Sequence, residues 1–503
     1  MNLLKIFQTS DIHGNIFPTN YVEEREHGLA KVSNLIKSRL NEEDSKLIID
    51  SGDVLQGNSL AFYNEKFKNY SPSIIDGFNL IGYDAITLGN HEFNYGIDYL
   101  TNHYKRFNND ILVANIEGLP LDTVPYKIYT FGELRVAVIG LTTDFIPNWE
   151  QPINIEGLTF SSPVDTYAKY EQALVENSDL IIVNYHGGFE CDLEHAQTLT
   201  EPDTSENVGS SLVRQFPSID IMLTGHQHRS IATKTKTAVC MQPGCNGASI
   251  SEIVIDIDSK QIISYELLET NGIEPDSVII DHFETQNINC NQYLDTALCS
   301  LNRDISITDV ASARLHSHPF LSFLGQAFTS YWDADFVALS LFDTAIGFKQ
   351  DVTIRQVNQN YPFPNTIMKI EITGQQMIEA IKQANNYYTL KDGEIAVHES
   401  YITPKLKHYN YDMYWGIEYT VNVTATENIV TDVKVKGQPL DTEQTYTMLV
   451  SNYRYNNRGD YPIYHDVKLI SESQDDAIEI LLKYLSDNKQ LVIEDSINYT
   501  ITK

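Results

Sequence analysis

The sequence predicts a layered α/β domain followed by a second, α+β region. The first half alternates short apolar, β-rich runs with amphipathic stretches, the runs are continuously apolar, and the pattern changes after about residue 271. Continuous apolar runs are typical of strands buried on both faces, and strands that alternate with helices predict helices covering a sheet. At 503 residues, the chain is also too long for one hydrophobic core.

The predicted strands of the first half are seven apolar runs. In chain order they lie at residues 3–10, 46–52, 83–89, 110–115, 135–141, 179–186 and 220–226. Helical periodicity is present between several of them, as at residues 29–40 and 164–177. We therefore expect one α/β domain over residues 1–272.

Residues 273–308 are expected to connect this domain to the next. Turn residues at 271–276 lead into a polar helical stretch that we expect to continue through "YLDTALCSLNRD". The second domain is then residues 309–503. It is expected to contain a helix at 375–388 and strands at residues 334–342, 367–374, 414–423 and 446–452.

The composition excludes some classes of function. A net charge of −33 argues against binding nucleic-acid polymers, because an acidic surface repels a phosphate backbone. Five cysteines, an odd number without a CxxC pair, fit reduced thiols in a cytoplasmic protein. No signal-peptide pattern and no apolar run of membrane-spanning length is present, so we expect an intracellular protein without a membrane partner. A chain whose signal had been removed would show the same pattern.

Polar residues follow five of the predicted strands, usually beside glycine. They are Asp11 and His13 in "DIH", Asp53 in "GDVLQG", Asn90 and His91 in "GNHE", His186 in "HGG", and His226 and His228 in "GHQH". Because the carboxyl ends of strands in an open α/β sheet meet at one ligand crevice, these side chains are expected to converge. The neighbouring glycines allow sharp turns and a close approach of the ligand.

The residue types in these motifs predict a metal centre. Imidazole, carboxylate and amide donors without a thiolate suit Mn²⁺, Zn²⁺, Fe or Co²⁺. The donors are too numerous for one tetrahedral ion and fit two divalent ions with a shared ligand. Two ions about 3.5–4 Å apart are typical of in-line attack on phosphorus. Each motif alone is also compatible with a structural, hydrogen-bonded residue, so the prediction depends on the ordered set.

The ordered set resembles the calcineurin-like metallophosphoesterases. The two-domain layout is similar to their 5′-nucleotidase and 2′,3′-cyclic-nucleotide phosphodiesterase branch, and the likeness extends to "YPFPNTI", "ITGQQMIEAI" and "SNYRYNNRGDYP". The resemblance implies a four-layer αββα metallophosphoesterase domain that binds the metals. It also implies a 5′-nucleotidase-type C-terminal domain that binds the nucleoside of a small-molecule nucleotide.

The resemblance implies which residues bind each ion. The first ion is assigned to Asp11, His13, Asp53 and His228, and the second to Asp53, Asn90, His186 and His226, with Asp53 bridging. His91 is similar to the family's catalytic histidine, which faces the scissile phosphate. It would stabilise charge on the phosphate or donate a proton to the leaving alkoxide. Glu92 is given no role and is expected at the surface or behind the ligands.

Two departures from the 5′-nucleotidase pattern bear on the substrate. Asn94 occupies the place of an aspartate that holds the catalytic histidine, and an amide cannot raise histidine basicity as a carboxylate does. The region "ALSLFDTAIGF" lacks the family's "NGGxR" arginine, which makes polyphosphate substrates less favoured. With Asn94 at this place, the motif "GNHEFNYG" resembles the version found in the cyclic-phosphodiesterase branch.

Aromatic residues in the C-terminal loops are implied to bind the nucleobase. By resemblance, Phe363 and Tyr453 would stack on the base and Asp460 would bond to it or lie close to it. Stacking contributes roughly 1–3 kcal/mol per base and tolerates base identity. Tyr455 competes for the position of Tyr453, and the alternative for each aromatic residue is ordinary core packing.

We therefore expect a dimetal hydrolase of nucleotides, closest to a 2′,3′-cyclic-nucleotide phosphodiesterase with 3′-nucleotidase activity. A 5′-nucleotidase is the main alternative. A nucleoside-binding protein that has lost catalysis and a hydrolase of another ester or of a sulfur compound are the others.

Overall fold

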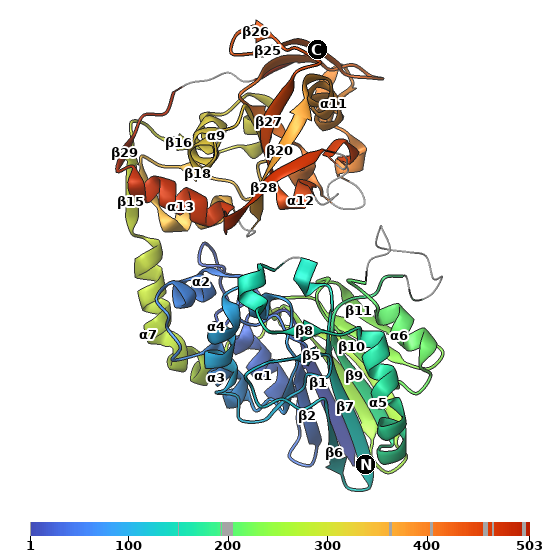
Figure 1. Cartoon of the computed structure of the whole chain (residues 1–503). Helices are drawn as coiled ribbons and strands as arrows, with labels where there is room; N and C mark the ends of the chain where they lie inside the picture. The colour runs from blue at the N-terminus through green and yellow to red at the C-terminus, as the bar shows by residue number, and fades with distance from the viewer. Residues whose placement is uncertain are drawn as a thin grey trace. The chain divides into compact units, whose positions relative to one another are not determined.

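The chain divides into two compact units, Met1–Asn291 and Gln292–Lys503. The computed structural model describes residues 2–148, 150–191, 193, 205–361, 365–402, 406–455, 461–464, 467–494 and 499–503. The division lies within the predicted connector, and the predicted domain bounds themselves stay predictions. Each unit is described by itself below (Figure 1).

The described part of the first unit contains two six-stranded sheets. In spatial order, the first sheet consists of β14 (Gln261–Glu269), β13 (Ser249–Asp256), β1 (Leu3–Thr9), β2 (Ser45–Asp50), β3 (Ala85–Ile86) and β4 (Asp110–Ile111). The second consists of β11 (Ser230–Lys234), β12 (Val239–Pro243), β10 (Ile221–Thr224), β9 (Leu180–His186), β7 (Leu134–Thr142) and β6 (Tyr126–Phe131).

The two sheets share one hydrophobic core. Leu47 and Ile49 of β2 belong to the same buried cluster as Val136 and Val138 of β7. Every residue of β9 is buried, as expected for a strand covered on both faces. The continuously apolar runs therefore reflect sheet-on-sheet packing on one face and helix packing on the other.

Helices cover the outer faces of both sheets. Figure 1 shows α1 (Leu29–Arg39), α3 (Ile74–Ile81) and α4 (Gly96–Tyr104) on one side, and α5 (Pro163–Asn177) and α6 (Gly209–Gln215) on the other. Tyr167 and Leu174 of α5 and Leu212 of α6 pack on the outer face of the second sheet. The order helix, sheet, sheet, helix confirms the predicted αββα architecture.

The second unit is built around a five-stranded mixed sheet. Its strands, in spatial order, are β23 (Met413–Trp415), β17 (Phe336–Leu339), β27 (Thr445–Ser451), β20 (Thr366–Thr373) and β28 (Lys468–Asp476). The remaining helices and strands used below are α9 (Pro319–Tyr331), α11 (Gly374–Asn385), α12 (Asn452–Tyr455), α13 (Ala477–Asp487), β24 (Glu418–Asn422) and β30 (Tyr499–Thr502). Within the described residues, no helix has the length and apolar composition needed to span a bilayer.

Two predicted elements differ from the structure. Residues 414–423 are not one strand, because the chain breaks at Gly416 (φ 86°) and its two halves, β23 and β24, lie in different sheets. A side chain at Gly416 would lie 2.1 Å from the carbonyl oxygen of Asp335. The connector helix α7 (Ser277–Leu294) also ends earlier than predicted. Residues Ala297–Leu301 form a strand instead, because two other strands pair with them.

Candidate metal centre

Parallel strands bring the predicted polar residues to one edge of the first unit. Strands β1, β2 and β3 run parallel to one another, and β9 runs parallel to β10. The polar residues follow the carboxyl ends of these strands, and His186 is the last residue of β9. Residues that follow strands of the first sheet contact residues at or just after the ends of strands of the second sheet.

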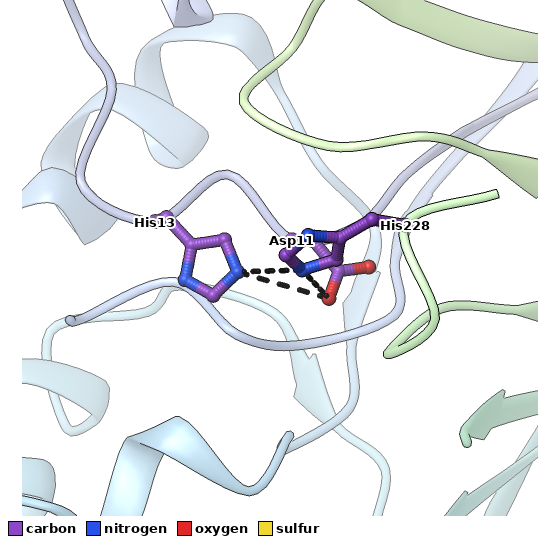
Figure 2. A group of neighbouring side chains, drawn as sticks. All are labelled: Asp11, His13 and His228. Carbon is purple, nitrogen blue, oxygen red and sulfur yellow. Dashed lines mark hydrogen bonds and ion pairs between the residues drawn. The ribbon is translucent and has the colours of Figure 1, made fainter. Parts of the chain in front are cut away.

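The first group consists of Asp11, His13 and His228 (Figure 2). The Nε2 atoms of His13 and His228 lie 3.0 Å apart. His228 Nε2 lies 3.3 Å and His13 Nε2 3.9 Å from Asp11 Oδ1. One potential ligand atom of each residue therefore points to a common position.

The second group consists of Asp53, His186 and His226, with Asn90 among them. His186 Nε2 lies 3.2 Å from Asp53 Oδ2 and 3.1 Å from Asn90 Oδ1. His226 Nδ1 lies 2.8 Å from the same amide oxygen. Four donors from four strand ends thus surround a second common position.

The two groups are adjacent. The backbone N–H of His226, in the second group, donates to both carboxylate oxygens of Asp11 at 3.1 Å. The backbone N–H of His91 donates to Asp53 Oδ1 at 2.8 Å, and the His91 ring lies 5.4 Å from that of His13. His91 therefore lies beside both groups.

Five of the seven predicted ligands have left-handed backbone conformations. The φ angles are 54° at Asp11, 50° at His13, 60° at Asp53, 67° at His226 and 54° at His228. Residues other than glycine seldom adopt this conformation, which costs of the order of 1 kcal/mol each. Such strain persists only where surrounding contacts enforce it, and here it is concentrated on side chains that converge.

Two glycines let these loops meet. A side chain at Gly89 would lie 2.2 Å from Asp53 Oδ1 and 2.7 Å from His186. Gly52 has φ 99°, and a side chain there would lie 2.4 Å from the backbone nitrogen of Gly89. The close approach of backbone to ligand therefore requires glycine at both positions.

Hydrogen bonds on the outer side of the imidazoles set which nitrogen faces the centre. His13 Nδ1 donates to the carbonyl of Gln56 at 2.8 Å, and His186 Nδ1 donates to that of Ser51 at 2.7 Å. His226 is oriented the other way, and its Nε2 donates to Glu206 Oε1 at 3.0 Å. These acceptors leave Nε2 of the first two rings, and Nδ1 of His226, directed toward the shared positions.

Nearby positive charges keep the buried carboxylate of Asp53 ionised. Burial alone would raise the pKa of Asp53, but the charges of His186 and His91 hold it well below its usual range. Burial likewise opposes the charge of His186, yet Asp53 raises the pKa of that imidazole to about 9. The anionic Asp53 therefore lies against a protonated His186, and a bound cation would take the place of that proton.

These residues fit a pair of divalent cations. They supply imidazole nitrogens, two buried carboxylates and one amide oxygen, a donor set that suits Mn²⁺, Zn²⁺, Fe or Co²⁺. The left-handed backbone and the preset imidazole orientations show that the donors are held in place by the surrounding chain.

His91 is oriented by Asn94. His91 Nδ1 lies 2.6 Å from Asn94 Oδ1 and donates to it, because an amide oxygen can only accept. The opposite nitrogen, Nε2, lies on the other side of the ring. Both residues lie in the loop after β3, at the start of the helical turn His91–Phe93 and just after it.

Glu92 has a role that the sequence did not predict. It is 1% exposed, and its carboxylate accepts four backbone N–H groups. These come from Asp53, Val54, Leu55 and Gly89, at 2.5–3.2 Å. Glu92 therefore holds the loop that carries Asp53 against the loop that carries Asn90. Glu92 is therefore not at the surface. It lies behind the predicted ligands, which was the other expected position.

The predicted nucleoside-binding residues are only partly described. Phe363 and Asp460 lie outside the described residues. Tyr453 lies in α12 of the second unit, and its ring is 6.4 Å from that of Tyr409. The neighbouring Arg454 is 3% exposed and donates to Asp412 at 2.8 Å.

Comparisons with known proteins agree with this arrangement. Residues 4–230 match the family model described as calcineurin-like phosphoesterase, and residues 300–466 match the 5′-nucleotidase C-terminal domain. A crystal structure of a Staphylococcus aureus protein, named as a 5′-nucleotidase candidate, shares 36% identity over all of both chains with a TM-score of 0.84.

Two curated bacterial proteins are more distant. A Salmonella typhimurium 2′,3′-cyclic-nucleotide 2′-phosphodiesterase/3′-nucleotidase is 22% identical over 90% of this chain and 81% of its own length. The Bacillus subtilis trifunctional nucleotide phosphoesterase YfkN is 23% identical over 99% of this chain, which spans 39% of that protein.

Proposed function

Because the chain belongs to the calcineurin-like phosphoesterases with a 5′-nucleotidase C-terminal domain, it is a metal-dependent phosphoric ester hydrolase, and we propose that its substrates are 2′,3′-cyclic nucleotides and 3′-nucleotides. The observation that carries this choice is the contact between His91 and Asn94 at 2.6 Å, where the 5′-nucleotidase pattern has a carboxylate. The name of the Salmonella relative supports the same choice.

The proposed roles follow from the positions of the side chains. The seven predicted ligands would hold two divalent ions, which when bound would polarise the phosphate and activate water for in-line attack. His91 lies beside both ligand groups with Nδ1 bonded to Asn94 Oδ1. When Nε2 also carries a proton, His91 can hydrogen-bond to a phosphate oxygen and pass that proton to the leaving alkoxide oxygen, which leaves the ring protonated at Nδ1. The buried carboxylates of Asp11 and Asp53 would supply the negative charge of the ligand set.

A substrate panel tests the proposal. Initial rates are measured for 2′,3′-cyclic AMP, 3′-AMP and 5′-AMP with the Mn²⁺-loaded protein. We expect kcat/KM for the first two to exceed that for 5′-AMP by at least about tenfold, which is about 1.4 kcal/mol of transition-state stabilisation. Faster hydrolysis of 5′-AMP would overturn the proposal.

A 5′-nucleotidase is the second candidate. The observation that favours it is the 36% identity with the Staphylococcus aureus protein, which is named as a 5′-nucleotidase candidate. The same panel separates the two, because the position of the phosphate is the only variable.

A further inference from the structure

A glutamate lies behind the asparagine that orients His91. Asn94 Nδ2 donates to Glu150 Oε2 at 2.7 Å. The other carboxylate oxygen, Oε1, accepts the backbone N–H of Gln151 and the side chain of Asn154, both at 2.8 Å. Asn154 also donates to the backbone carbonyl of Asn94 at 2.9 Å. Glu150 is thus fixed by two donors and offers its second oxygen to Asn94.

The chemistry of these groups determines the direction of each hydrogen bond. An ionised carboxylate only accepts, so the group of Asn94 that faces Glu150 must be the NH₂. The carbonyl of Asn94 must then face His91, and a carbonyl oxygen also only accepts. His91 Nδ1 is therefore protonated, and Nε2 is the nitrogen available on the other side of the ring.

We propose that Glu150 is a positioning residue for the reaction, acting through Asn94 to hold His91 as the Nδ1-protonated tautomer. This inference rests on the proposed function, because it assigns His91 to the phosphate. It explains how an asparagine can replace the aspartate of the 5′-nucleotidase pattern. The negative charge lies one residue further from His91, and the Asn94 amide, oriented by that charge, determines which nitrogen of His91 carries the proton.

The proposal predicts that two single substitutions are harmful and that together they compensate. In Glu150→Gln, Oε1 keeps its two donors, and the new NH₂ meets the NH₂ of Asn94, so the Asn94 amide turns and presents NH₂ to His91. In Asn94→Asp, two carboxylates face each other. In the double variant, the introduced glutamine donates its NH₂ to the introduced aspartate, which then accepts hydrogen bonds on both sides.

The experiment measures kcat for 2′,3′-cyclic AMP and 3′-AMP with the Mn²⁺-loaded full chain. We expect kcat to fall by about tenfold in each single variant and to return to within about threefold of the wild type in the double variant. Glu156→Gln, at an exposed glutamate of the same loop, is the matched control and is expected to leave kcat unchanged. Bound metal is counted in every variant and is expected to equal that of the wild type.

A second readout does not depend on activity. The ¹⁵N chemical shifts of the His91 ring, assigned with His91→Gln, report the tautomer in metal-free protein. We expect Nδ1 to be protonated in the wild type and in the double variant, and Nε2 to be protonated in neutral Glu150→Gln. If no nucleotide is hydrolysed but the shifts change in this way, the proposed function fails, whereas the control of the His91 tautomer by Glu150 stands. A double variant whose loss equals the product of the single losses, or unchanged shifts in Glu150→Gln, would overturn the role.

Discussion

At the scale of single residues, the centre depends on buried charges whose partners come from other strands. Asp53 is 1% exposed and lies against His186, and its carboxylate also accepts the backbone N–H of His91. It therefore joins the ligand set to the loop that carries the proposed catalytic histidine. A change of charge at this position should therefore affect both metal binding and the placement of His91.

Substituting Asp53 by asparagine should remove metal. The amide keeps the size of the side chain but not its charge, so we expect one or both ions to be lost and kcat/KM to fall more than about a hundredfold. Metal content by elemental analysis and phosphate release are the measurements. Asp98→Asn, at an exposed carboxylate of α4, is the control. Full metal content in Asp53→Asn would contradict the assignment.

Glu92→Gln should destabilise the first unit. A glutamine has one accepting oxygen, so its NH₂ would face two of the four backbone N–H groups that Glu92 now accepts. We expect the free energy of unfolding in urea to fall by about 1–3 kcal/mol. Glu117→Gln, at an exposed glutamate of the same unit, should leave it unchanged. Equal stability of both variants would show that the four contacts contribute little.

At the scale of elements, α3 and α4 meet through a buried histidine. His103 of α4 is 1% exposed, and its Nδ1 lies 2.6 Å from the hydroxyl of Ser73, which caps α3. Burial lowers the pKa of His103 to about 4, from an ordinary value of 6.5. Between these two pH values, His103 is protonated in the unfolded chain but neutral in the folded protein.

This pKa shift predicts a pH dependence of stability. As the pH falls from 6.5 to 4, the unfolded chain gains a proton at His103 and the folded chain does not, so the free energy of unfolding falls, by up to about 3 kcal/mol. Urea unfolding at several pH values measures it. In His103→Gln the slope over this range should be smaller, since the other titrating groups are common to both proteins. Identical slopes would rule out this contribution.

Elements also show how far the sequence predicts the fold. The seven apolar runs of the first unit were predicted because burial on both faces leaves an uninterrupted apolar pattern. The strand at Ala297–Leu301 was missed because only its pairing with distant strands makes it one. The break at Gly416 was missed because one glycine in an apolar run does not reveal a change of sheet.

The same distinction applies to the centre. Its seven ligand candidates were predicted because each follows a strand, in an order that resembles a known family. Glu150 and Glu206 were missed, since each contacts its partner across a sequence separation of 56 or 20 residues and no local motif marks either. A residue that contacts a ligand or His91's partner from behind, from a distant part of the chain, does not belong to any recognisable sequence motif.

At the scale of the whole molecule, one unit carries the metal centre and the other carries the proposed nucleoside-binding residues. We expect Tyr453→Ala to raise KM for 3′-AMP by about tenfold with a smaller change in kcat, because lost base stacking costs roughly 1–3 kcal/mol. Tyr455→Ala, two residues away in α12, is the comparison. A larger rise in KM for Tyr455→Ala would transfer the stacking role to that residue.

The central claim is that two divalent ions bind where the two groups of side chains converge and that hydrolysis requires both. The most direct test is the rate of 2′,3′-cyclic AMP hydrolysis by chelator-treated protein as Mn²⁺ is added in known equivalents. We predict no hydrolysis without metal and a rate that reaches its plateau when two ions are bound per chain. Full activity in metal-free protein, or a plateau at one bound ion, would contradict the account.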